Sequence, residues 1–152
     1  MHTWRPRQKI RILAIGLAWR VGKLLAAEVY DDAGHLKGVR PLGGGVEFGE
    51  RWQDALRREF QEELSLAVEI TGPPYVLENI YTHHGQTGHE IVFAANVALP
   101  TGALDGQEVI HFREDGGQDC VARWFDLGAL TTRGVALFPA GLATALAPGE
   151  PD

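Results

Sequence analysis

Three glutamates lie close together in a stretch of the chain that favours a helix. Glu59, Glu62 and Glu63 fall within five residues. Because a helix advances about 100° per residue, their side chains project into one sector about 100° wide. Like charges this close repel one another and raise each other's pKa, so a cation should compensate for them. Arg58 is the positive charge beside that sector, and carboxylate oxygens are ligands that Mg²⁺ favours. The spacing therefore predicts a magnesium platform.

Glycines precede this helix. Residues 43–45 are all glycine and begin a predicted loop over residues 43–49, flexible enough for backbone oxygens to approach a ligand. The helix is expected over residues 50–64, where apolar residues recur at helical spacing. Its predicted buried stripe consists of Leu56, Phe60 and Leu64.

The stretch over residues 44–66 resembles the signature of the Nudix hydrolase family. That signature has a glycine, five residues, a glutamate, seven residues, Arg-Glu, a bulky apolar residue, any residue, Glu-Glu, any residue, a glycine and a bulky apolar residue. The matching residues are Gly44, Glu50, Arg58, Glu59, Phe60, Glu62, Glu63 and Leu66. Ser65 stands where the family has its last glycine. A non-glycine residue in the left-handed conformation expected there costs about 1 kcal/mol, so either Ser65 bears that strain or the helix ends differently.

The resemblance implies a divalent-metal-dependent hydrolase that cleaves the diphosphate of a nucleoside diphosphate linked to another group, by attack of water on phosphorus. Mg²⁺ or Mn²⁺ would neutralise the charge of the phosphate oxygens. By matching position, Arg58 should pair with helix carboxylates, including Glu50, and hold them in place. The implied metal ligands are oxygen donors of Glu59, Glu62 and Glu63, with the carbonyl of Gly43.

The general base lies outside the signature. Glu114, in the glycine-rich segment 113–119, is the first choice, with Glu108 and Glu90 as alternatives; each is also readable as an ordinary exposed carboxylate. Glu90 is further expected to line the substrate pocket. Arg40, just before the glycine run, is expected to clamp a substrate phosphate, although a surface salt bridge is an equal alternative.

Three histidines, His83, His84 and His89, suggest a zinc site at first sight. Their spacing matches no common zinc motif, and no cysteine lies near them in the sequence. We therefore expect a polar turn rather than a structural zinc site.

Composition limits the function classes. The chain of 152 residues is expected to form a single domain, with residues 1–8 and 148–152 flexible. Its formal net charge of −6 argues against sequence-independent nucleic-acid binding. The one cysteine, Cys120, excludes an intramolecular disulfide and suits the cytoplasm, and no apolar run reaches membrane length. A homodimer is left open, because relatives of this fold are often dimers.

The elements around the helix predict an α/β fold of the α+β type. Strands are expected over residues 10–19, 24–30, 36–39, 66–70, 75–81, 90–99 and 121–125, and loops over 100–106 and 113–119. Residues 139–147 carry leucines at helical spacing. Strands with two helices fit a mixed, partly antiparallel sheet between helical layers, which is also the α/β/α sandwich that the resemblance implies.

Three other functions remain to be weighed. A sensor of the same fold, without catalysis, should have lost carboxylates of the signature, and none is lost. A prenyl diphosphate isomerase would need an active-site cysteine, and Cys120 is far along the chain from the signature. An RNA-decapping enzyme would need a basic surface or an RNA-binding appendage, which the sequence does not show.

Overall fold

The computed structural model describes residues 3–114 and 116–147. Within these ranges it has nine strands and three helices. In chain order they are β1 (Ile10–Arg20), β2 (Lys23–Tyr30), β3 (Leu36–Gly45), α1 (Trp52–Leu64), β4 (Glu69–Ile70), β5 (Tyr75–His83), β6 (Gln86–Ala98), β7 (Val109–Arg113), β8 (Asp119–Phe125), α2 (Leu127–Arg133), β9 (Ala136–Leu137) and α3 (Leu142–Leu146).

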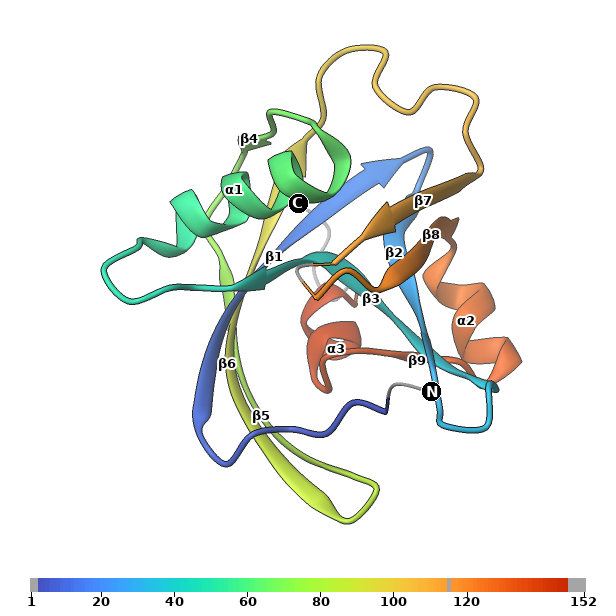
Figure 1. Cartoon of the computed structure of the whole chain (residues 1–152). Coiled ribbons are helices and arrows are strands. Elements are labelled where there is room, and N and C mark those ends of the chain that lie inside the picture. The colour runs from blue at the N-terminus through green and yellow to red at the C-terminus, as the bar shows by residue number, and fades with distance from the viewer. Residues whose placement is uncertain (1–2, 115, 148–152) are drawn as a thin grey trace.

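The strands form one strongly curled mixed sheet (Figure 1). Its main path is β4-β6-β1-β3-β2-β8-β7, with β5 on β6 and β9 on β3. β1 runs parallel to β6 and antiparallel to β3. β3 pairs with β2 through its first half and with β1 through its second half. β3, the strand that precedes α1, therefore joins the part of the sheet that contains β1 to the part that contains β2.

Helices cover both faces of this sheet, which confirms the predicted mixed sheet between helical layers. Successive side chains of a strand point to opposite faces, so Ala14 and Ala18 of β1 pack with Phe60 of α1. Ile15 and Leu17 pack on the other face with Leu142 of α3. Leu130 of α2 belongs to a third cluster, with residues of β2, β3 and β8.

A glycine sets how closely α1 approaches β1. A Cβ at Gly16 would lie 2.5 Å from Cε1 of Phe60, so the bare backbone makes room for the ring. Phe60 is fully buried, and Leu56 beside it is also fully buried. Burying each of these side chains stabilises the fold by about 1.5–3 kcal/mol, which fixes the helix that carries the three glutamates.

Several boundaries differ from those expected from sequence. α1 begins at Trp52 rather than at residue 50, and β3 continues to Gly45, so the predicted loop over residues 43–49 is shorter. The expected strand over residues 66–70 is reduced to β4. Three elements, β7, α2 and the short β9, were missed. The start of α2 could have been predicted from Asp126, a preferred N-cap residue, whose side chain accepts a hydrogen bond from the backbone N–H of Ala129.

The beginning of the described chain has neither helix nor strand, but it lies against the sheet. The Trp4 ring stacks on Tyr81 with centroids 6.4 Å apart, and Arg5 Nη2 lies 2.8 Å from Asp32 Oδ2. The predicted flexibility of residues 1–2 and 148–152 lies outside the described residues. None of the described helices has the length and apolar character needed to span a bilayer.

Candidate functional site

The glycines at the end of β3 allow a carboxylate to lie directly against the backbone. A Cβ at Gly44 would lie 2.5–2.7 Å from the three carboxyl atoms of Glu59. At Gly43, whose φ is +151°, a Cβ would collide with the carbonyl oxygen of Ala14 in the neighbouring strand. Both positions therefore require glycine for space, and Gly43 also for its conformation. This close contact fixes Glu59 beside the β3 backbone.

Arg58 joins the helix to the end of β3. Its Nε and Nη2 donate to the two carboxylate oxygens of Glu50 at 2.8 Å and 3.0 Å, as a bidentate pair. Nη2 also donates to the carbonyl of Gly45 at 2.9 Å, and Nη1 to Oε1 of Glu59 at 3.0 Å. Glu62 is a more distant partner, at 3.4 Å. The expected contact between Arg58 and Glu50 is therefore present.

This network has a clear electrostatic effect. The hydrogen bond to Glu50, followed by the charge of Glu59, raises the pKa of the Arg58 guanidinium above its ordinary value. The same pair lowers the pKa of Glu50. Arg58 and Glu50 are therefore both charged at neutral pH. The guanidinium of Arg58 binds the carboxylates of Glu50 and Glu59 instead of pointing into solvent.

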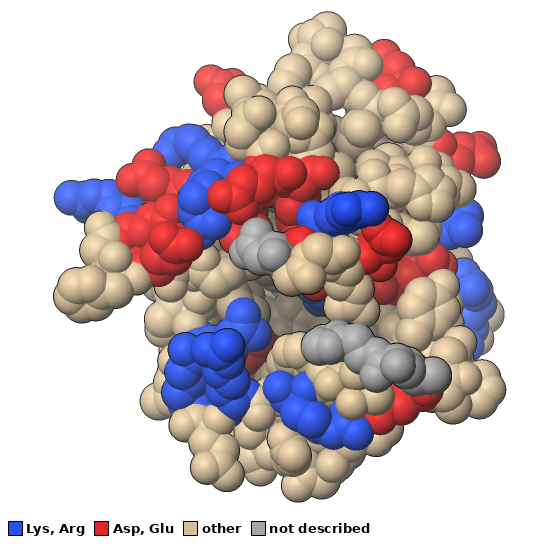
Figure 2. All heavy atoms as spheres, viewed as in Figure 1, with Lys and Arg blue, Asp and Glu red and all other residues tan. Residues whose placement is uncertain are grey.

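The three glutamates differ in exposure. Glu59 is 2% exposed, Glu63 is half-buried and Glu62 is exposed. Figure 2 shows acidic side chains gathered over α1 beside a hollow, with basic side chains gathered across that hollow. The donors that α1 offers are carboxylate oxygens, and backbone carbonyls lie beside them at the end of β3. This oxygen-only donor set fits a hard divalent cation such as Mg²⁺ or Mn²⁺.

Glu114 lies in the turn between β7 and β8. Its carboxylate forms an ion pair with the guanidinium of Arg40 on β3. Its backbone N–H donates to the carbonyl of Gln118 at 3.0 Å, which fixes the turn. The two residues proposed separately from sequence as base and phosphate clamp are thus in contact, which is the salt-bridge alternative for Arg40.

Cys120 on β8 links this turn to α1. Burial, followed by the charge of Glu114 and with a smaller contribution from Glu63, raises the pKa of its thiol to about 12, although the charge of Arg40 acts to lower it. Cys120 therefore lies within electrostatic reach of both carboxylates. Cys120 is far from the signature in the sequence, but the fold brings it near Glu63 of the signature. The thiol is nevertheless protonated at neutral pH, as expected of a half-buried residue.

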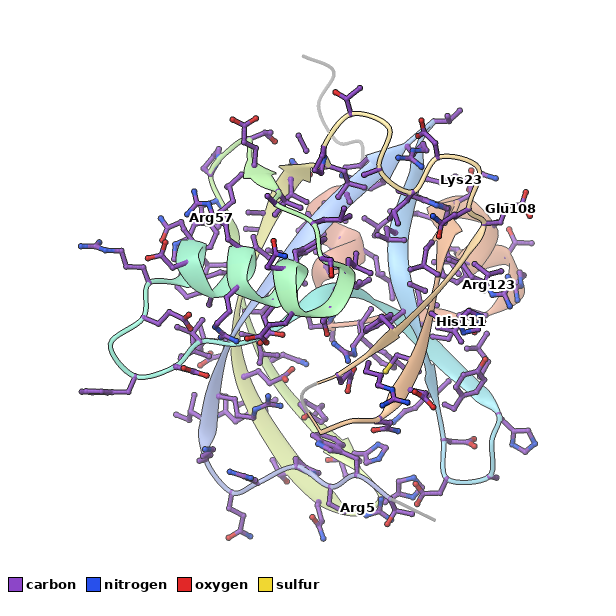
Figure 3. The ribbon with its side chains drawn as sticks, turned by 45° about the horizontal axis from the view of Figure 1, so that its top comes forward. Arg5, Lys23, Arg57, Glu108, His111 and Arg123 are labelled. Carbon is purple, nitrogen blue, oxygen red and sulfur yellow. The ribbon has the colours of Figure 1, made fainter. Side chains whose placement is uncertain are left out.

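The other two candidate bases lie elsewhere. Glu108 is exposed and precedes β7, whereas Glu114 follows it; Figure 3 shows Glu108 on the side of Lys23 and Arg123, away from Arg57 of α1. Glu90 is not on a loop: it is 9% exposed in β6, and Asn79 Nδ2 donates to its Oε1 at 3.4 Å.

A row of polar side chains around Glu90 was missed by sequence reasoning. Arg11, Glu90 and Asn79 are direct partners across β1, β6 and β5. Burial, followed by the charge of Glu90, raises the pKa of the nearby Tyr81 to about 12, although the charge of Arg11 acts to lower it. The Arg11 guanidinium reaches toward Gly45, where a Cβ would lie 3.9 Å from Nη2. No local pattern in the sequence marked this row, because the pairing of the three strands brings its members together.

Ser65 adopts the left-handed conformation expected of the missing glycine. Its φ is 56° and its ψ is 37°, and its N–H donates to the carbonyl of Gln61 at 3.0 Å. Leu66 N–H reaches back to the carbonyl of Phe60 at 3.4 Å, which completes a Schellman-type end. Of the two alternatives from sequence, Ser65 therefore bears the strain, and α1 ends as a glycine would end it.

Comparisons with known proteins agree with this geometry. The family model described as NUDIX domain matches residues 11–144. Nucleoside triphosphatase NudI of Escherichia coli and of Shigella flexneri is 45% identical over 65 residues. That match covers 40% of this chain and 46% of the relative, so it spans less than half the length of those proteins.

Solved structures share the fold. The solution structure of the E. coli ORF135 protein has a TM-score of 0.57 at 22% identity and covers 93% of this chain and 96% of that one. The crystal structure of MutT NUDIX hydrolase from Burkholderia pseudomallei has a TM-score of 0.55 at 23% identity, over 80% and 86%. At these identities the likeness shows the fold alone.

Proposed function

Because the chain belongs to the Nudix family and is a Nudix-type hydrolase, we propose that it cleaves the diphosphate of a nucleoside diphosphate derivative with the help of a divalent metal ion. The observation that carries the proposal is the way Arg58 ties Glu50 and Glu59 to the end of β3. Such a network fixes carboxylate oxygens at the mouth of a hollow, where a polyphosphate would enter.

The metal would be held by Glu59 and Glu63, with Glu62 and the carbonyl of Gly43 as further oxygen donors. When bound, Mg²⁺ or Mn²⁺ supplies positive charge to the phosphate oxygens of the substrate. Arg58 and Glu50 act as positioning residues, because their hydrogen bonds hold Glu59 and the β3 backbone in place. Rigid placement of charge in advance of the reaction is what lowers the barrier.

We assign the general base to Glu114. Its carboxylate takes a proton from the water that attacks phosphorus, the new phosphorus–oxygen bond forms, and the bond from phosphorus to the bridging oxygen breaks. The electron pair leaves with the departing phosphate. The ion pair with Arg40 supports this role, because it holds the Glu114 carboxylate in one orientation. Arg40 would give its remaining N–H groups to a substrate phosphate.

Glu90 is proposed to bind the nucleoside or the linked group rather than to act as a base. Its burial and its contact with Asn79 support this role, because a buried carboxylate accepts hydrogen bonds from N–H or O–H groups of a ligand. Arg11 beside it would meet a negative group. The single cysteine further supports the predicted cytoplasmic location, and a homodimer stays a prediction.

A screen for product release tests the proposal. Nucleoside triphosphates, ADP-ribose, dinucleoside polyphosphates, sugar nucleotides and oxidised nucleotides are incubated with the protein and Mg²⁺ or Mn²⁺, and the products are separated by mass. We expect one class to give a nucleoside monophosphate, only with metal present. Release without metal would contradict the proposed chemistry. Binding of a nucleotide without turnover of any compound would favour the sensor.

A further inference from the structure

Two turns that are far apart in the sequence bring three metal-ligating side chains together. Asp32 lies in the turn between β2 and β3, His83 is the last residue of β5, and His84 follows it in the turn between β5 and β6. One ligand atom of each lies within 4.8 Å of the others. Both turns are in the lower part of Figure 1, whereas α1 is in the upper part. This cluster is therefore separate from the carboxylates of the proposed active site.

The geometry is close to that of a coordination shell. His84 Nε2 and Asp32 Oδ2 are 3.3 Å apart. Two ligands at about 2.0–2.1 Å from an ion and at a tetrahedral angle are about 3.3–3.4 Å apart. The rings of His83 and His84 meet edge to face, with centroids 4.5 Å apart. The third donor, from His83, lies within 4.8 Å of the other two.

Two cations now occupy the positions that an ion would take. Arg5 Nη2 lies 2.8 Å from Asp32 Oδ2, and Lys37 Nζ lies 2.9 Å from His83 Nδ1. Both are long side chains, and Arg5 is on a segment without helix or strand, so they can move aside at small cost.

We infer that Asp32, His83 and His84 form a second metal site, which takes Zn²⁺ or a similar divalent transition-metal ion and joins the two turns. Two imidazoles and one carboxylate are the donors that Zn²⁺, Co²⁺ and Ni²⁺ accept, with water in the fourth position. Mg²⁺ requires oxygen ligands and should not bind here. The two sites would thus select different metal ions: the oxygen donors of α1 would select Mg²⁺ or Mn²⁺, and the imidazoles would select Zn²⁺ or a similar ion.

The neighbouring cations allow a test that would not apply to an ordinary surface histidine. Arg5 and Lys37 compete with the ion for Asp32 and His83, so removal of either charge should strengthen metal binding. Loss of a ligand should weaken it at least tenfold. His35 is a matched control, because it lies in the same turn as Asp32, is 81% exposed, and is not in the cluster.

The test is titration of the full-length protein with Co²⁺ in the presence of excess Mg²⁺, followed by visible absorption. We expect one equivalent to give the bands of a four-coordinate nitrogen and oxygen site, and Zn²⁺ to displace it and raise Tm. Asp32→Asn and His84→Ala should lower the affinity at least tenfold and abolish the Tm shift; His35→Ala should bind as the wild type does. Arg5→Gln and Lys37→Gln should bind several-fold more tightly.

Either of two results would overturn the inference. One is that the wild-type protein binds no Co²⁺ when excess Mg²⁺ keeps Co²⁺ off the carboxylates of α1. The other is equal binding by wild type and His84→Ala, which would place the ion elsewhere. The test needs no turnover of substrate, so it stands independently of the proposed hydrolysis.

Discussion

Arg40 on β3 donates to the carboxylate of Glu114 in the turn between β7 and β8. The strand that leads into α1 is thereby tied to the segment that carries the candidate base. Cys120 lies near this pair and near Glu63, since the charges of all three residues act on its thiol. The ion pair therefore couples the placement of the base to the placement of the carboxylates.

Replacement of the base should abolish most of the activity. Glu114→Gln keeps the shape of the side chain but removes its ability to accept a proton, so kcat should fall by about 10²–10⁴-fold. Glu108→Gln is the matched control, because Glu108 is exposed and lies before β7. Arg40→Gln separates loss of the base from loss of the ion pair, and its kcat should fall less. An unchanged kcat in Glu114→Gln would eliminate it as the base.

The Cys120 thiol should be slow to react with alkylating reagents. Its pKa of about 12 leaves far less thiolate at pH 8 than a free cysteine with a pKa of about 8.5 has. Because a raised pKa favours the protonated form, the rate in the folded protein should rise with pH toward 12. Glu114→Gln should speed alkylation at pH 9, since it removes a charge that raises this pKa. Alkylation as fast as that of a small free thiol would show that Cys120 is not buried beside these carboxylates.

Crowding at Gly44 should be specific to that position. In Gly44→Ala the new Cβ would lie 2.5 Å from Cδ of Glu59, so the carboxylate must move. We expect a lower kcat and a need for more Mg²⁺ to reach half-maximal rate. At Gly45 the nearest atom to a Cβ is Arg11 Nη2 at 3.9 Å, so Gly45→Ala should have a much smaller effect. Equal kinetics in the two variants would argue that Glu59 is not held against Gly44.

Removal of the strain at Ser65 should stabilise the protein. Ser65 holds a φ of 56°, and glycine adopts this conformation at about 1 kcal/mol less cost. Ser65→Gly should therefore raise the free energy of unfolding by roughly that amount, as measured by urea denaturation, whereas Ser65→Ala should not. Activity should be unchanged, because Ser65 offers no ligand to the metal. A large gain in kcat would show that the end of α1 limits the reaction.

The sequence predicted those parts of the fold and the site that depend on local spacing. The helical spacing of Glu59, Glu62 and Glu63 gave α1, and the signature predicted the contact of Arg58 with Glu50. The left-handed Ser65 was one of the two alternatives that the replaced glycine left open. In each case a few neighbouring residues decide the conformation.

Contacts across the sheet were not predictable in the same way. His83, His84 and His89 were set aside because their spacing matches no common zinc motif, and Asp32, which the fold brings to two of them, lies about fifty residues earlier. Cys120 looked remote from the signature until β8 placed it near Glu63. Pairing of strands decides these distances, and neither composition nor periodicity specifies which strands become neighbours.

The most direct test of the account is the turnover of Glu63→Gln with the substrate class found by the screen. Glu69→Gln is the matched control, because Glu69 is exposed on β4 and lies outside α1. Steady-state kcat is measured with saturating Mg²⁺, and Tm is measured to show that both variants are folded. We predict that Glu63→Gln loses at least a hundredfold in kcat at nearly unchanged Tm, while Glu69→Gln keeps its activity. Equal rates in Glu63→Gln and the wild type would contradict a metal site on α1.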